Sequence, residues 1–170
     1  MTATLGNILL VFLADRPGTA HELQQRHAET FGRERSVDIA RVLAALRRQE
    51  RLGSVGTEAA SQPRRPVVCF LTDAGYARQR SWMLGVPPDV TGEDIIVRVL
   101  LATAAADRET FDAVIESCLT ALKSQRSRSR RAAVLEAGSA LAEYEDTVAA
   151  SLQTWLRRLA GRPRRRDAAA

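Results

Sequence analysis

Apolar side chains recur at helical spacing in two short segments at the start of the chain. In the first segment they fall at i, i+3, i+4 and i+7, which predicts an amphipathic helix that ends before Pro17; these residues are Leu5, Ile8, Leu9 and Phe12. The second segment begins at Thr19, which with Glu22 predicts a capping box, and Gly32 marks its end. The chain is therefore expected to open with two short helices.

A third helical segment follows, and arginines lie on the side opposite its apolar residues. We expect this helix to begin near Asp38, with Ser36 or Asp38 as its N-cap, and to end near Gly53. The residues predicted to point inward are Ile39, Val42, Leu43 and Leu46. Helical geometry turns the opposite side outward, and that predicted exposed face holds Asp38, Arg41, Ala45 and Arg48.

Beyond the third helix the apolar period changes to two, which is typical of strands. Residues 54–58 and 67–71 are predicted strands, and residues 59–66 between them are predicted to form an exposed turn. Two prolines stiffen this turn and two arginines project from it; they are Pro63, Pro66, Arg64 and Arg65. Thr72 is the predicted N-cap of a fourth helix, which residues 85–88 end.

Three further helices are predicted after this break, and they do not easily bury their apolar faces alone. Residues 95–101 leave almost no polar face, so their helix is expected to be buried nearly all round. Pairing with the same region of a second copy would cover the remaining faces. The predicted organisation is a winged helix-turn-helix domain over 1–85, a linker over 86–92, a helical dimerisation domain over 93–161 and a basic flexible tail over 162–170.

Composition and charge fit a mainly α protein with a small β-hairpin. The chain has 170 residues and only 5% aromatic residues, and its formal charge of +5 comes almost wholly from arginine because Lys123 is the single lysine. Arginine suits phosphates and guanine edges, although a GC-rich coding sequence would also favour it. Cys69 and Cys118 lie in apolar patterns and are predicted to be buried free thiols in a reducing compartment. No apolar run approaches membrane-spanning length, so we expect a cytoplasmic protein without membrane contact.

An enzyme is not expected from this sequence. Neither His21 nor His27 stands beside a cysteine or serine in a plausible nucleophile setting, and there is no metal-ligand spacing and no glycine-rich phosphate loop. We therefore expect no metal, no cofactor and no catalytic residue. The order helix, hairpin, helix instead predicts a winged helix, which lays one helix in the DNA major groove and its hairpin on the neighbouring backbone.

The chain resembles the PadR family of bacterial transcriptional regulators over most of its length. The family's His-Gly-Tyr-Glu-Leu element is matched by residues 19–23, and its recognition helix, Ser-x-Gly-x-Ile-Tyr-Pro-x-Leu-x-Arg-Leu-Glu-x-x-Gly, is matched by residues 38–53. Its Leu-Thr-x-x-Gly element is matched by residues 71–75, and its frequent terminal Trp-Leu by Trp155 and Leu156. The resemblance implies a homodimeric DNA-binding regulator, most often a repressor.

Four positions depart from the family pattern. The family's recognition-helix tyrosine and proline become Leu43 and Ala44, its serine becomes Asp38, and the tyrosine of its second helix becomes His21. The contacts that the family makes with DNA at those positions do not transfer. The resemblance also implies a small aromatic or hydrophobic effector, for which Trp82 and Trp155 are the candidate pocket residues; the alternative is that both are core or dimer anchors.

The candidate DNA contacts are arginines and a few polar residues of the predicted winged helix-turn-helix domain over 1–85, which we call the head. Arg41 is the candidate base contact, because arginine bidentate to guanine is the commonest specific pairing. The remaining candidates are Arg47, Arg48, His21 and Ser36, which are expected to contact the DNA backbone, and Arg64 and Arg65, which are expected to contact phosphate or the minor groove. Two alternatives remain: the helix arginines pair with Glu34 or Glu50, or the winged helix is a protein-interaction module that has lost specific DNA binding.

Overall fold

The protein is mainly helical, with one two-stranded antiparallel hairpin, as the sequence predicts. A computed structural model describes residues 3–58, 66–126, 136–164 and 167. In chain order the elements are α1 (Leu5–Asp15), α2 (Ala20–Phe31), the short 3-10 helix η1 (Arg33–Arg35), α3 (Ile39–Arg51), β1 (Val55–Glu58), β2 (Val68–Leu71), α4 (Asp73–Leu84), α5 (Gly92–Ala105), α6 (Arg108–Arg126) and α7 (Ala137–Ala160).

The predicted helix starts are confirmed by their capping hydrogen bonds. Thr19 and Glu22 form the capping box of α2, in which the Thr19 backbone N–H donates to Glu22 Oε2 at 2.7 Å. Asp38, not Ser36, caps α3 by accepting from the Ala40 backbone N–H at 3.0 Å. Gly32 ends α2 with a φ of +91°, a conformation that favours glycine. Short polar side chains therefore fix where these helices begin.

The outer edge of strand β2 is hydrogen-bonded to the loop between α1 and α2. β1 and β2 pair with Val55 opposite Leu71 and Glu58 opposite Val68. The Gly18 N–H donates to the Cys69 carbonyl at 3.0 Å and the Cys69 N–H donates to the Gly18 carbonyl at 2.9 Å. Because the loop between α1 and α2 bonds β2 in this way, the base of the hairpin is attached to the helical core.

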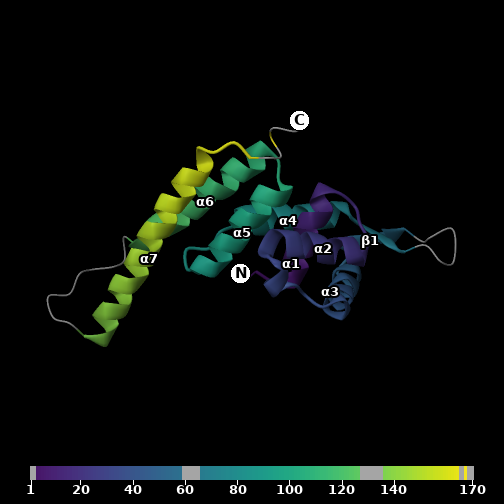
Figure 1. Ribbon diagram of the computed structural model, residues 1–170, viewed down its shortest axis with the longest axis horizontal. Coiled ribbons are helices and arrows are strands. Elements are labelled where there is room, and N and C mark those ends of the chain that lie inside the picture. Colours follow the sequence, from purple (N-terminus) through teal and green to yellow (C-terminus); the bar gives the residue numbers. More distant parts are fainter. Residues whose placement is uncertain (1–2, 59–65, 127–135, 165–166, 168–170) are drawn as a thin grey trace.

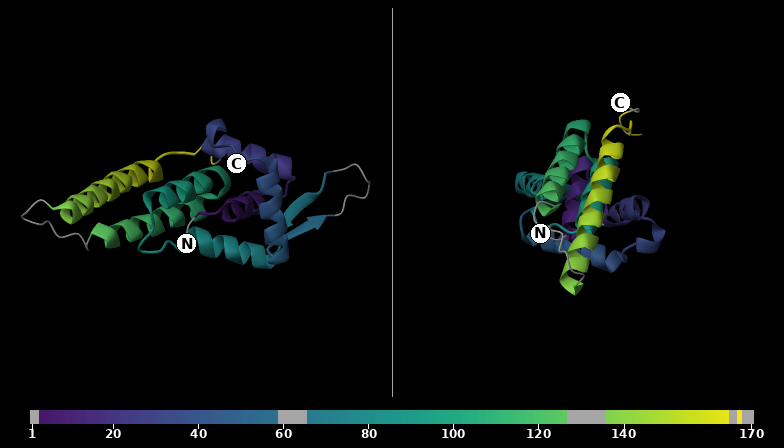
Figure 2. Two further views of the ribbon diagram at one scale, coloured as in Figure 1. Left: turned by 90° about the horizontal axis from the view of Figure 1, so that it is seen from below. Right: turned by 90° about the vertical axis from the view of Figure 1, so that its left-hand side faces the viewer.

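One continuous apolar core joins the head to the C-terminal helices. α1 lies at its centre, where Leu9, Leu10 and Leu13 are at most 1% exposed, and it contacts α3, α4, α5 and β2. The molecule is elongated, with the hairpin at one end and the α6–α7 pair at the other (Figures 1 and 2). Since α5 packs directly on α1, the head and the C-terminal helices share side-chain contacts.

Three burial expectations need correction. Leu43 is 40% exposed, because a step of about 100° from the buried Val42 carries it toward the rim of α3. Ala45, expected to face outward, is half-buried against the core. α5 is not buried all round, since Ile96 is 37% exposed and Val97 and Leu100 are half-buried along a surface groove.

Arginines donate to backbone carbonyls at the C-terminal ends of four helices. Because the last carbonyls of a helix lack intrahelical partners and carry partial negative charge, a guanidinium there stabilises the end. Arg26 Nη1 donates to the carbonyls of Phe12 and Arg16 at 3.0 and 2.9 Å, at the end of α1. Arg98 donates in the same way to the Trp82 carbonyl near the end of α4, and Arg108 to the Ala160 carbonyl at the end of α7. Arg164 donates to the carbonyls of Ala102 and Ala106, where α5 ends. We call these four residues the arginine caps.

Several titratable groups are buried in apolar surroundings. His27 is 6% exposed, contacts the Phe31 ring at 4.8 Å, and has a lowered pKa because burial disfavours its charged form. Burial also raises the pKa of Cys118 to about 11, and both cysteines are free and buried as expected. Among the described residues no cluster of potential metal ligands is present, and no described helix is long and apolar enough to cross a membrane.

Candidate nucleic-acid interface

The exposed face of α3 carries a line of small side chains with arginines on either side, and we call this line of alanines the ridge. With about 100° per residue, Ala40 and Ala44 lie farthest from the buried Val42 and Leu46. Arg47 flanks this ridge on one side, Arg41 and Arg48 flank it on the other, and Arg51 continues it toward the C-terminal end; all are exposed. Small residues along the ridge allow the helix backbone to approach a partner closely, while the long guanidinium side chains reach to either side.

The inner face of α3 is held firmly on the core. Val42 is fully buried and Leu46 is 5% exposed, and Gln49 continues the same face at 4% exposed. A Cβ at Gly6 of α1 would lie 2.4 Å from Gln49 Nε2, so the Gln49 side chain packs closely against the α1 backbone. Gln24 Nε2 donates to the Val37 carbonyl at 2.8 Å, which fixes the segment before α3 to α2. The exposed face therefore belongs to a rigidly seated helix.

The α3 arginines have no carboxylate partner within the part of the chain that the structure describes. None of Arg41, Arg47, Arg48 and Arg51 forms an ion pair there. Glu50, one of the two expected partners, instead accepts a hydrogen bond from Thr57 Oγ1 of β1 at 3.1 Å. The alternative of internally paired arginines is thus not supported. Their positive charge faces solvent, where it is available to an anionic partner.

The other predicted contact residues lie at separate places. His21 is exposed in the first turn of α2, and Ser36 is exposed between η1 and α3. Arg64 and Arg65, predicted at the hairpin turn, lie outside the described residues. α3 and the hairpin lie toward the same end of the molecule, whereas α6 and α7 lie toward the other (Figure 1).

One arginine of the α3 face, and a pair of exposed arginines outside it, were missed from the sequence. Arg51 is one helical turn after Arg47, and its i, i+4 spacing was the available signal. Arg33 and Arg35 sit on η1, an element that the sequence patterns did not predict, and both are exposed. A helix of only one turn has too few residues to show periodicity, so propensity alone could not have found it.

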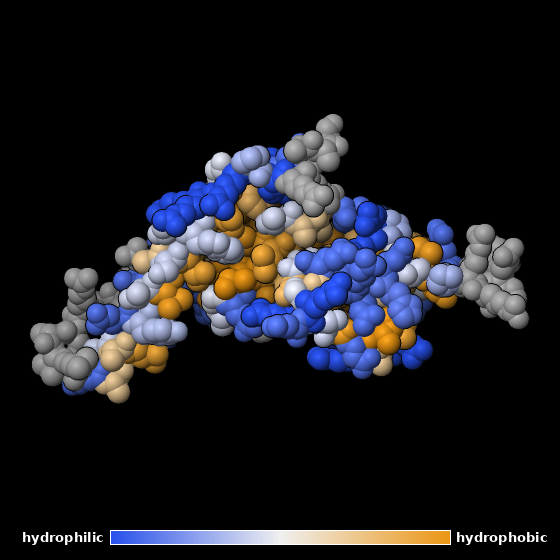
Figure 3. All heavy atoms as spheres, in the orientation of Figure 1, coloured by the Kyte–Doolittle hydropathy of each residue, from blue (hydrophilic) through white to orange (hydrophobic). Residues whose placement is uncertain are grey.

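A groove of about 940 Å³ opens between α5, α6 and α7. Its floor is apolar and comes from three helices: Ile96, Val97 and Leu100 of α5, Leu122 of α6, and Val148 and Leu152 of α7. Phe31 and Arg35 of the head border it, together with Glu93, Glu145 and Asp146. Figure 3 shows apolar surface gathered between α7 and the head on this side of the molecule.

Neither candidate tryptophan lines this groove. Trp82 is 3% exposed and lies under the Arg98 guanidinium, which is 4.3 Å from its ring centroid. Trp155 is half-buried on α7, against the core. The structure thus places Trp82 and Trp155 in packed surroundings, and neither belongs to the residues that line the groove.

No protein-family model and no curated protein matches the chain. Among solved structures, it is similar to Bacillus subtilis PadR in complex with operator DNA, with 15% identity, a TM-score of 0.43, and coverage of 93% of this chain and 98% of that one. It is also similar to a PadR-like transcriptional regulator from Bacillus cereus, with 15% identity, a TM-score of 0.41, and coverage of 91% of this chain and 92% of that one. A third similar structure is the Streptococcus mutans protein smu.1604c, with 15% identity, a TM-score of 0.41, and coverage of 95% of this chain and 100% of that one. At this level of similarity, function has to be inferred from the residues of this chain.

Proposed function

We propose that this protein is a sequence-specific DNA-binding transcriptional regulator. The observation that carries the proposal is the exposed face of α3, where arginines without a carboxylate partner among the described residues flank a ridge of alanines on a rigidly held helix. A helix of this shape fits the major groove of DNA, and the hairpin beside it would lie along the neighbouring backbone. The sequence resemblance to PadR regulators supports the same function.

Each arginine would have a distinct role in this arrangement. Arg41 would donate to a guanine edge, which presents two acceptors that match the guanidinium fork. Arg47 and Arg48 would contact phosphates on the two sides of the groove, because they flank the ridge from opposite sides. His21 and Ser36 would add backbone contacts from α2 and the start of α3, and Arg64 and Arg65 from the hairpin turn.

Binding to a duplex selected from a random-sequence pool tests these roles. We expect Arg41→Ala to cost about 1 to 3 kcal/mol at one base position of each half-site, because it removes a bidentate base contact. Arg47→Ala and Arg48→Ala should weaken binding to all duplexes alike, and each should reduce the log–log salt slope by roughly 0.9 for every phosphate that the variant no longer neutralises. Fluorescence anisotropy across a salt series measures both effects.

Arg157→Ala provides the matched control, since it removes one exposed arginine in the last turn of α7. It should leave both the affinity for DNA and the salt slope unchanged.

The rival function is a protein-docking module. Three partly exposed apolar residues of the head favour it: Leu43, Leu52 and Val67, at 40%, 49% and 51% exposure. Weak binding of equal strength to every duplex, unaffected by Arg41→Ala, would decide for that rival.

We further propose that two copies associate through their C-terminal helices. Leu141 and Tyr144 on α7 are 57% and 66% exposed, which is apolar surface that a second copy would cover. Sedimentation of the protein should therefore show a dimer, and Leu141→Glu together with Tyr144→Glu should shift it toward monomer. Two heads would then contact half-sites about one helical turn apart. A monomer at micromolar concentration would contradict this proposal.

The regulator would act as a repressor that a small aromatic or hydrophobic effector releases from DNA. Such a ligand needs an apolar site of several hundred cubic ångströms, and the groove between α5, α6 and α7 offers one. α5 lines the groove with one face and packs on α1 of the head with another, so a ligand there contacts an element that the head shares. Release of the selected duplex by apolar compounds, abolished in Leu100→Gln, tests this role.

A further inference from the structure

The chain after α7 folds back onto α5 and α6. Arg164 is only 6% exposed although it belongs to an arginine-rich tail. Its Nη1 donates to the carbonyls of Ala102 and Ala106, at 3.1 and 3.0 Å, where α5 ends. Its guanidinium carbon lies 4.7 Å from the centre of the buried Phe111 ring of α6. One tail residue therefore contacts both helices on which α7 rests.

Asp167 holds this guanidinium in place from the solvent side. Arg164 Nε donates to Asp167 Oδ2 at 3.0 Å and Arg164 Nη2 donates to Asp167 Oδ1, so the pair is bidentate. The Asp167 backbone N–H also donates to the Arg164 carbonyl at 3.0 Å, which closes a turn. Both nitrogens that do not reach α5 are thus occupied by one carboxylate.

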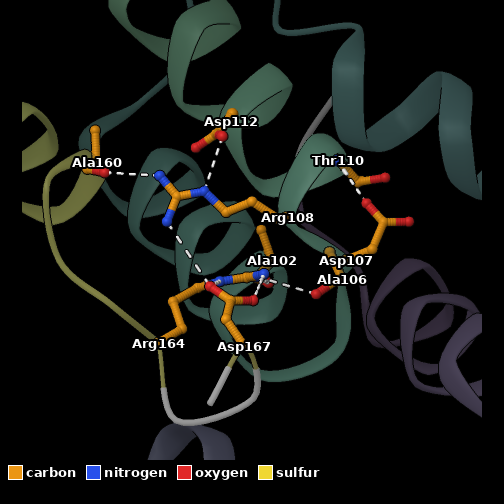
Figure 4. A network of polar contacts seen from close by, with 9 residues as sticks. All are labelled: Ala102, Ala106, Asp107, Arg108, Thr110, Asp112, Ala160, Arg164 and Asp167. Carbon is orange, nitrogen blue, oxygen red and sulfur yellow. Dashed lines mark hydrogen bonds and ion pairs between the residues drawn. The ribbon is translucent and has the colours of Figure 1, made fainter. Parts of the chain in front are cut away.

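Arg108 connects the same group to the end of α7. Its Nη2 donates to the Ala160 carbonyl at 2.9 Å, its Nε donates to Asp112 Oδ2 at 2.8 Å, and its Nη1 lies 3.7 Å from Asp167 Oδ2 (Figure 4). The two arginines and two aspartates form a chain of contacts from α7 through the tail to the turn between α5 and α6. We call Arg164 and Asp167, held by Arg108, the C-terminal strap.

α7 is docked on α5 and α6 along one apolar stripe, in which Leu152, Trp155, Leu159 and Ala160 pack half-buried against the core. Within the described part of this helix only Ala149, Gln153 and Leu156 are buried, although the helix spans 24 residues. Leu152 makes a close approach to α5, since a Cβ at Gly92 would lie 3.2 Å from its Cδ1. A long helix with only three fully buried side chains also depends on the contacts at its ends.

We propose that the C-terminal strap is a latch that keeps α7 docked on α5 and α6, and that its release frees the α7 wall of the groove. The strap lies at the end of α7 where Ala160 meets Arg108, and Val148 and Leu152 of the same helix line the groove. Opening the strap would remove the fixed end and let this wall move away from the apolar floor. The inference requires neither DNA binding nor dimerisation.

Hydrogen–deuterium exchange of the full chain tests the latch. Arg164→Gln removes the guanidinium, and we expect amide exchange in residues 150–160 to rise by roughly tenfold or more while α1 to α3 stay unchanged. Arg162→Gln is the matched control, because Arg162 is exposed in the same tail and the charge change is identical. It should not alter exchange in α7.

A second readout follows the groove itself. Fluorescence of the neutral dye Nile red should increase severalfold in Arg164→Gln and stay at the original level in Arg162→Gln, because only the first substitution exposes more of the apolar floor. If Arg164→Gln unfolds the whole chain, Asp167→Asn serves instead, since it weakens the strap without removing the buried guanidinium; a smaller rise confined to α7 is then expected. Exchange that changes only in residues 161–167, with no change in α7, would overturn the latch.

Discussion

Gly75→Ala is expected to destabilise the head by about 3 kcal/mol, at the upper end of what overpacking usually costs. Gly75 lies in the first turn of α4, and a Cβ there would stand 2.0 Å from the Ser54 carbonyl oxygen and 3.0 Å from Leu71 Cδ2. Ser54 O cannot retreat easily, because it accepts from the Thr72 backbone N–H at 3.2 Å. Relief would require α4 to move away from the base of the hairpin.

Urea unfolding followed by circular dichroism measures this destabilisation, and the chain offers a matched control. Gly138 also lies near the start of a helix, and a Cβ there would meet nothing within 4 Å. Gly138→Ala should therefore stabilise the protein by up to about 1 kcal/mol, through helix propensity alone. The two substitutions are chemically identical, so opposite signs would assign the Gly75 effect to the backbone contact. Equal effects would show that α4 can adjust.

Arg98→Ala is the second substitution with a large expected effect, a destabilisation of about 3 to 5 kcal/mol on the scale of deleting a large buried side chain. The Arg98 side chain is fully buried in α5, lies over the Trp82 ring at 4.3 Å, and donates to the Trp82 carbonyl at the end of α4. Burial lowers its pKa, because the charged form loses hydration. Truncation would leave both a cavity and a helix end without its donor.

Arg98→Met and Arg98→Lys separate these two causes. Methionine fills most of the volume without burying a charge, and replacement of a buried charge by an apolar residue is often neutral or stabilising. Lysine keeps the charge but lacks the planar fork that stacks on the indole. Chemical unfolding should therefore rank the variants with methionine above lysine and lysine above alanine. A lysine variant as stable as the original protein would refute a requirement for the fork.

Sequence patterns could predict the elements of this fold because local signals coincide with tertiary contacts. Thr19 with Glu22, Asp38 and Thr72 all cap the helices that their spacing indicates. Helical period also placed Val42 and Leu46 inside. It misplaced Leu43, since a residue one step from a buried position can point to either side of the boundary, and only neighbouring elements decide which.

The candidate interface could be found from the sequence only in part. The α3 arginines were recognised because a charged helix face is a local pattern. The role of other arginines as donors to helix ends could not be predicted from the sequence. Arg26, Arg98 and Arg164 donate to carbonyls that lie 14, 16 and 62 residues away along the chain. A buried arginine and an exposed one look alike in sequence, so the total charge of the chain does not measure its exposed positive surface.

The arginine caps also set an order in which the chain can complete its structure during synthesis. The ends of α1 and α4 receive their donors 14 and 16 residues later, so the head can close while the rest of the chain is still being made. The end of α5 receives its donor, Arg164, only after 62 more residues have been made. Arg108 likewise precedes its acceptor, the Ala160 carbonyl at the end of α7, by 52 residues. Since proteins fold from the N-terminus as they emerge, a chain whose synthesis stops after Arg98 has emerged but before residue 164 would carry a finished head on an unfinished C-terminal half.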